Sequence, residues 1–121
     1  MLPYAVLDIR YYSARPASDG QSPFEKWFAG LDPVARAKVT TAIVRLGQGN
    51  LSNVKGVGEG VLEYRINFGP GYRVYFGRDG ETLVILLTGG TKKRQQRDIA
   101  GAIEMWAAYK SRKRPPRQTE E

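Results

Sequence analysis

Two arginines and a tyrosine, spaced along two neighbouring strands, are the residues of this chain best suited to chemistry. Residues 60–76 alternate between apolar and polar side chains on both sides of a Gly-Pro-Gly turn, a pattern that predicts a β-hairpin. Residues two apart share a face of a strand, so one face of the hairpin is apolar and the other polar. The polar face carries Glu63, Arg65, Asn67, Arg73 and Tyr75.

A three-residue turn predicts the register of this hairpin. Asn67 is then opposite Arg73, and Arg65 is opposite Tyr75. Two guanidinium groups in one patch repel each other unless an anion or a carboxylate lies between them, and Glu63 is the one acid in reach on this face. The polar face is therefore predicted to suit a phosphate. The alternative is that both arginines are ordinary solvated strand residues, paired with Glu63.

Start signals divide the rest of the chain into the elements that would position this face. Ser22 and Asp32 are good N-caps, and each is followed by a proline, which fits the first turn of a helix. Glu25 completes a capping box with Ser22. The predicted elements are a strand at 4–12, a loop at 13–21, helices at 22–30 and 32–46, a loop at 47–60, the hairpin, a buried strand at 82–88 and a C-terminal helix.

Two basic segments flank the hairpin. Residues 47–60 contain five glycines and a single lysine, Lys55, which predicts a loop that could reach over the polar face. Lys92, Lys93 and Arg94 open the last helix, where cations oppose the helix dipole unless an anion binds there. We therefore expect this turn to meet phosphate, with Asp98 offsetting part of its charge.

Composition narrows the chemistry further. The chain has no cysteine and no histidine, which removes thiol chemistry and the common ligands of zinc and redox metals, so no metal or cofactor is expected. Any catalysis must use lysine, arginine, tyrosine or carboxylates. No apolar stretch approaches the length of a membrane span and no leader pattern is present, so we expect a soluble, cytoplasmic protein.

The positive charge is concentrated towards the C-terminus. The net charge is +7; residues 1–90 hold ten basic and eight acidic side chains, whereas residues 91–117 hold nine and two. Such clustering is typical of a protein that binds a polyanion. With 121 residues the chain is expected to form one domain at 1–110, followed by a basic, flexible tail at 111–121, for which a purely solubilising role is the alternative.

Several motifs together resemble a known superfamily over roughly residues 4–110. They are Gly58-x-Gly60-Val61-x-Glu63-x-Arg65-Ile66, Phe68-Gly69-Pro70-Gly71-Tyr72-Arg73-Val74-Tyr75-Phe76, Leu86-Leu87-x-Gly89-Gly90-x-Lys92 and Gln96-x-Asp98-Ile99-x-x-Ala102. The chain is similar to the RelE/ParE toxins, and within them to the HigB-like branch called addiction module killer proteins. It departs from the family pattern at Tyr64, Thr91 and Arg94, where Leu, an acid and a small residue are more frequent.

The resemblance implies a fold and a function. The fold is α+β, with the order β-α-α-β-β-β-α, a mainly antiparallel four-stranded sheet, two N-terminal helices and a C-terminal helix. The function is that of the toxin of a type II toxin–antitoxin system, a ribosome-dependent mRNA endoribonuclease that acts in the ribosomal A site and inhibits translation. Its partner is a cognate antitoxin, which in this branch usually carries a helix-turn-helix DNA-binding domain.

The chemistry of metal-independent RNA cleavage can be assigned to residues of this chain. It needs a base for the 2′-hydroxyl, positive charge for the transition state and a proton donor for the 5′-oxygen. A lysine among other cations has its pKa lowered, so Lys93 or Lys55 is the candidate base. Arg65 and Arg73 would hold the phosphate, and one of them or Tyr75 would help to protonate the leaving group. The expected RNA-binding residues are Lys55, Lys92, Arg94 and Arg97.

Two other functions fit the same fold. The first is a ParE-like inhibitor of DNA gyrase, which performs no RNA chemistry. The second is a non-catalytic RNA-binding or ribosome-associated domain. The arginines on the polar face favour the nuclease, because guanidinium groups suit phosphoryl chemistry and have no evident role in binding DNA gyrase.

Overall fold

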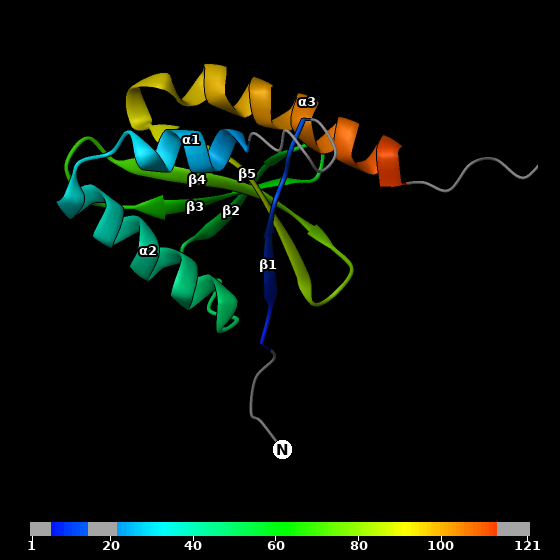
Figure 1. The fold of residues 1–121 in the computed structure, drawn as a ribbon, viewed down its shortest axis with the longest axis horizontal. Helices are drawn as coiled ribbons and strands as arrows, with labels where there is room; N and C mark the ends of the chain where they lie inside the picture. Colours follow the sequence, from blue (N-terminus) through cyan, green and yellow to red (C-terminus); the bar gives the residue numbers. More distant parts are fainter. Residues whose placement is uncertain (1–5, 15–21, 114–121) are drawn as a thin grey trace, which may run out of the picture.

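The computed structural model describes residues 6–14 and 22–113. The start of the predicted first strand, most of the predicted loop at 13–21 and residues 114–121 of the predicted tail lie outside this part of the chain. Figure 1 labels the elements: β1 (Asp8–Tyr11), α1 (Pro23–Ala29), α2 (Pro33–Gly47), β2 (Val54–Gly58), β3 (Val61–Ile66), β4 (Tyr72–Asp79), β5 (Leu83–Thr91) and α3 (Gln95–Lys113), with a 3-10 turn at Lys92–Arg94 before α3.

The strands form one sheet in the order β1-β5-β4-β3-β2, in which β1 is parallel to β5 and the other neighbours are antiparallel. The α+β class and the mainly antiparallel sheet are confirmed, but the sheet has five strands and not four. The additional strand, β2, lies within the predicted loop at 47–60. Its many glycines made it look like a loop in the sequence. A strand of this composition is possible because it lies at the edge of the sheet, and its pairing with β3 is interrupted by a bulge between Gly56 and Gly58.

The predicted starts of α1 and α2 are confirmed, whereas Lys92–Arg94, predicted to open the last helix, form a separate 3-10 turn before α3. The Ser22 hydroxyl accepts a hydrogen bond from the Glu25 amide at 3.1 Å, and the Asp32 carboxylate accepts one from the Ala35 amide at 2.9 Å. Both caps satisfy amides that the first turn of a helix leaves without a partner. The helix α1 ends before Gly30, as predicted, and α3 runs to Lys113, beyond the predicted domain boundary at residue 110.

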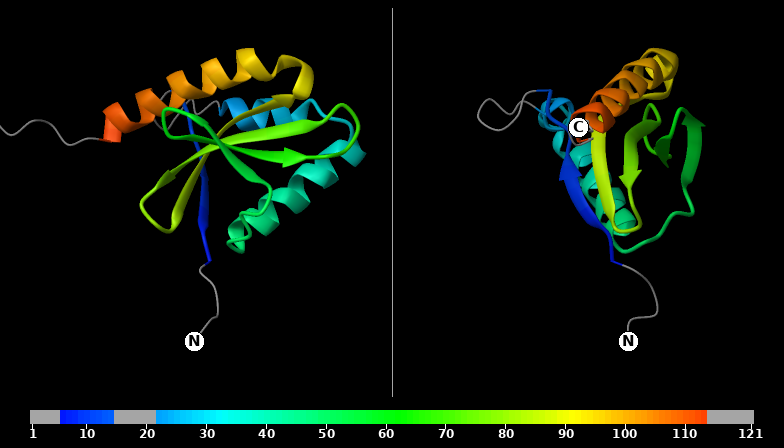
Figure 2. Two further views of the ribbon diagram at one scale, coloured as in Figure 1. Left: turned by 180° about the vertical axis from the view of Figure 1, so that it is seen from behind. Right: turned by 90° about the vertical axis from the view of Figure 1, so that its right-hand side faces the viewer.

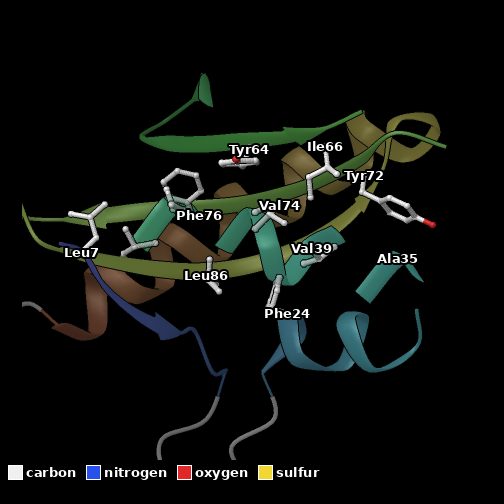
Figure 3. Close-up of a cluster of buried hydrophobic side chains, with 13 residues drawn as sticks. Leu7, Phe24, Ala35, Val39, Tyr64, Ile66, Tyr72, Val74, Phe76 and Leu86 are labelled. Carbon is white, nitrogen blue, oxygen red and sulfur yellow. The ribbon is translucent and has the colours of Figure 1, made fainter. Parts of the chain in front are cut away.

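Helices cover both faces of the sheet, and each face has its own core (Figure 2). On one face, α1 and α2 pack against the alternate apolar residues of β3, β4 and β5, including Tyr64, Val74, Phe76 and Leu86 (Figure 3). On the other face, α3 packs through Ala102 and Trp106. The strand β5 is therefore buried on both sides, as its continuous apolar run predicts.

One glycine allows α3 to lie close to the sheet. A Cβ atom at Gly77 would lie 2.5 Å from the Trp106 ring.

We expect Gly77→Ala to lower the free energy of unfolding by about 1–3 kcal/mol, because a rigid indole in a packed core has little room to move. Urea denaturation followed by tryptophan fluorescence measures this. Gly101→Ala is the control, since nothing lies within 4 Å of that position and alanine favours a helix; an equal loss in both variants would contradict the explanation.

Candidate functional site

The hairpin of β3 and β4 presents the predicted polar face, but in a different register. Arg65 is directly opposite Arg73, and Glu63 is opposite Tyr75. The predicted pairs, Asn67 with Arg73 and Arg65 with Tyr75, were wrong because the connection spans residues 67–71 and is longer than the three-residue turn. The shift is by two residues, so every side chain stays on its predicted face.

Glu63 is the centre of this face. Its carboxylate is fully buried and lies 2.9 Å from Nε of Arg65 and 3.8 Å from Nε of Arg73. The Gln95 side-chain amide, from the first turn of α3, donates a hydrogen bond to it at 2.8 Å. One negative charge thus separates two guanidinium groups that would otherwise repel across the strands. We call Glu63, Arg65, Arg73 and Gln95 the arginine cluster.

The two arginines differ in their access to solvent. The Arg65 side chain is 40% exposed, whereas that of Arg73 is 7% exposed. Because Glu63 carries one charge and the arginines carry two, the cluster keeps a net positive charge that faces solvent at Arg65. The geometry thus gives Arg65 the outer position and leaves Arg73 to support it from within.

Tyr75 lies under the cluster and away from solvent. Its side chain is fully buried in the core between the sheet and α3. Burial raises the pKa of its phenol, and the nearby carboxylate charges of Glu63 and Asp98 raise it further. The phenol is therefore neutral at physiological pH and does not reach the surface in this conformation. The sequence pattern placed Tyr75 on the correct face, but its complete burial depends on α3.

Two of the predicted lysines lie beside the cluster. Lys55 is exposed on β2, directly opposite Glu63, so it belongs to a strand and not to a loop, and it occupies the predicted face. Lys92 is joined to the turn before β4, because its amide donates to the Gly71 carbonyl at 2.7 Å. A Cβ at Gly71 would lie 3.3 Å from the Lys92 Cβ and 4.0 Å from Nη1 of Arg73. The glycine therefore lets the basic turn approach the arginines.

The candidate base Lys93 and the two remaining predicted RNA-binding residues, Arg94 and Arg97, lie further round the start of α3. Lys93, Arg94 and Arg97 are exposed and line a shallow depression of about 300 Å³. Arg94 also lines a larger cavity of about 460 Å³ between α1 and α3, with Lys26 and Trp27 at its α1 side. We call the exposed cations on β2 and at the start of α3 the basic rim: Lys55, Lys92, Lys93, Arg94 and Arg97.

Asp98, which was expected only to offset part of the charge of the basic turn, also contacts β5. A Cβ on Gly90 would lie 1.8 Å from its Oδ2 atom, so the carboxylate packs directly against the backbone of β5. Burial raises the pKa of Asp98, and the positive charges of Arg94 and Arg97 oppose this rise. Gln95 was not identified from the sequence, because a glutamine at a helix start has many common roles. The pair Gly89-Gly90 was the available signal, since adjacent glycines in a strand indicate close approach of other groups.

The raised pKa of Asp98 has a consequence for stability. A carboxyl whose pKa is higher in the folded state stabilises the protein fully below its unfolded pKa, and that contribution is lost as pH rises through the folded pKa. We therefore expect Asp98→Asn to raise the free energy of unfolding at pH 7, with a gain that disappears below about the ordinary value of 3.8. Urea denaturation across this pH range measures it. A gain that is equally large at both ends of the range would contradict the cause.

Asp79, on β4, offers a comparison of opposite sign. Its carboxylate accepts hydrogen bonds from the Lys113 ammonium at 2.7 Å and the Tyr109 hydroxyl at 2.6 Å, which lower its pKa. Its contribution is present above the unfolded pKa and is lost as pH falls through the folded pKa. In the same titration, Asp79→Asn should therefore lower the free energy of unfolding at pH 7 and leave it unchanged in acid.

Among residues 6–14 and 22–113, no group of three or more acidic, histidine or cysteine side chains is placed to hold a metal ion. No helix among them is long and apolar enough to cross a membrane.

The chain is similar to known proteins over most of its sheet and helices. A family described as "Phage derived protein Gp49-like (DUF891)" matches residues 26–107, which include α2, all the antiparallel strands and most of α3. An uncharacterized protein of Haemophilus influenzae is 44% identical over 80 residues, which cover 65% of this chain and 81% of that protein. The chain therefore belongs to the Gp49-like family, a toxin-like family of the RelE/HigB type that is associated with toxin–antitoxin systems.

Proposed function

We propose that this protein is the toxin of a type II toxin–antitoxin system and that it cleaves mRNA without a metal ion, on the ribosome. Membership of a toxin family supports the toxin role. The observation that carries the nuclease is Arg65, which is 40% exposed on a cluster of net positive charge. Such a group, held from behind by a buried carboxylate and a second arginine, suits a phosphate in a developing transition state.

In this proposal the RNA strand lies across the basic rim with one phosphodiester against Arg65. Lys93 or Lys55 takes the proton of the 2′-hydroxyl, whose oxygen attacks the adjacent phosphorus, and the bond from phosphorus to the 5′-oxygen breaks. The other lysine, as an ammonium, gives a proton to that 5′-oxygen. The products are a 2′,3′-cyclic phosphate and a free 5′-hydroxyl. Arg73 and Tyr75 act as positioning residues here, since both are buried.

The partner that silences the protein is proposed to be an antitoxin with a helix-turn-helix domain and an acidic segment. A segment of that kind complements a basic rim and would block access to Arg65. Lys92, Arg94 and Arg97 would then serve both RNA and the antitoxin.

Brief induction of the gene, with and without the neighbouring open reading frame, tests the proposal. We expect growth arrest that the neighbour relieves, and new transcript ends, with 5′-hydroxyl termini, that map inside reading frames. Plasmid supercoiling from the same cells distinguishes gyrase inhibition, which would relax plasmids and leave transcripts whole. Harmless expression without the neighbour would contradict the toxin role altogether.

A further inference from the structure

A second basic cavity lies on the other side of the β3 edge from the arginine cluster. It has a volume of about 280 Å³ and lies between α2 and the end of β3. Its polar lining consists of Lys38, Thr41, Arg45, Asn53, Arg65 and Asn67, with Tyr64 as the remaining ionisable residue. Among the described residues that line it there is no carboxylate. The cavity therefore offers positive charge and hydrogen-bond donors but nothing that would repel an anion.

The helix α2 presents these cations in one row. Lys38, Thr41 and Arg45 follow one another at intervals of three and four residues, the spacing that places side chains on one side of a helix. The row lies next to the buried stripe that contains Val39, Ala42 and Leu46. The helix therefore holds both cations beside the sheet and not on its solvent-facing back.

The cations of this row have no acidic partner within the described ranges. No carboxylate of residues 6–14 or 22–113 forms an ion pair with Lys38 or Arg45, and the Lys38 ammonium lies 4.9 Å from the centre of the Phe68 ring. Arg36 differs, because its guanidinium donates to the Leu31 carbonyl at 2.7 Å and so fixes the connection between α1 and α2. Arg36 therefore has a structural role, whereas Lys38 and Arg45 are available to bind an anion.

The edge of β3 is open where the cavity lies. The pairing of β2 with β3 begins at Val54 and Tyr64, and the Asn53 carbonyl accepts the last bond, from the Arg65 amide at 3.1 Å. Beyond that point no described strand lies on this side of β3, whose other side stays paired with β4. Arg65 is thus shared: its side chain belongs to the arginine cluster, and the residue also lines the second cavity. A chain of anions could pass from one to the other around this edge.

We propose that this cavity binds a backbone phosphate of the RNA strand, next to the one held at Arg65. The inference rests on the proposed nuclease function and extends its substrate site from the α3 side of the sheet to α2. An RNA strand fits because it carries a phosphate at every nucleotide, so a single chain supplies anions to both places at once.

The test is the binding of a fluorescein-labelled 2′-O-methyl RNA oligonucleotide, which cannot be cleaved because its 2′-oxygen is blocked. Fluorescence anisotropy gives the affinity of the whole chain at salt concentrations from about 50 to about 200 mM. We expect Lys38→Ala/Arg45→Ala to bind about tenfold more weakly at low salt. The slope of log affinity against log salt should become less steep by about 0.7, the value for one lost phosphate contact on a single strand.

The matched control is Arg10→Ala/Lys110→Ala, which also removes two exposed cations, from β1 and from the end of α3. It should bind as the wild type does. Equal affinities and slopes for the wild type and Lys38→Ala/Arg45→Ala would overturn the inference, even with transcript cleavage intact. A variant that still binds RNA but no longer binds the antitoxin would overturn it as well, by assigning the cavity to protein. If the wild type neither binds the RNA nor cleaves transcripts, the proposed function fails first.

Discussion

Arg65→Ala is expected to reduce mRNA cleavage by about 10²–10³-fold while the protein remains folded. Loss of one charged donor aimed at a developing oxyanion has an effect of this size. The fold should tolerate the change, because the Arg65 side chain is 40% exposed and Glu63 keeps Gln95 and Arg73. Transcript-end counts after induction, at matched protein levels, measure the activity.

Two further variants make the Arg65 test specific. Arg65→Lys keeps the charge but loses the planar fork of donors, so its cleavage should fall between that of the wild type and that of Arg65→Ala. Arg10→Ala removes an exposed arginine that pairs with Asp8 at 3.1 Å on β1, and it should cleave normally. Full activity of Arg65→Ala would remove the phosphate contact from the proposal. Equal losses in Arg10→Ala would show that net charge, and not position, matters.

Glu63→Ala is expected to lower the free energy of unfolding by about 3–5 kcal/mol, the largest stability effect of any substitution considered. It leaves Arg73, a buried cation, without its counter-charge, directly opposite a second arginine. Equilibrium urea denaturation followed by the fluorescence of Trp27 and Trp106 measures the change. Glu63→Gln keeps the shape and loses the charge, so it should be destabilised by less.

A double variant identifies the cause of that loss. When both buried charges are removed, no uncompensated charge remains, and replacing such a pair is often close to neutral. Glu63→Ala/Arg73→Ala should therefore lose clearly less stability than the sum of the two single variants. Additive losses would mean that the pair is not coupled and that Glu63 matters only for packing. A loss below about 1 kcal/mol in Glu63→Ala would contradict its central place in the cluster.

Local signals were sufficient for much of the fold. The N-caps at Ser22 and Asp32 fixed the helix starts, because a capping side chain bonds to an amide only three residues away. Alternation in β3 and β4 assigned each side chain to its face, and this survived the change in register because the shift was even. The buried nature of β5 followed from its apolar run for the same local reason.

Tertiary contacts decided what local signals could not. The edge strand β2 is specified by its pairing with β3, and its glycines resemble a loop in every local respect. The exposure of Arg65 and the burial of Arg73 and Tyr75 depend on where α3 lies, and Gln95 reaches Glu63 across 32 positions of the chain. The second cavity likewise depends on tertiary packing, because residues of α2 and of the open edge of β3 line it together. Residue types and their spacing thus determined which side chains share a face of the sheet. Only the packing of distant segments determined which of these side chains reach solvent, because access to water depends on every element that covers a group.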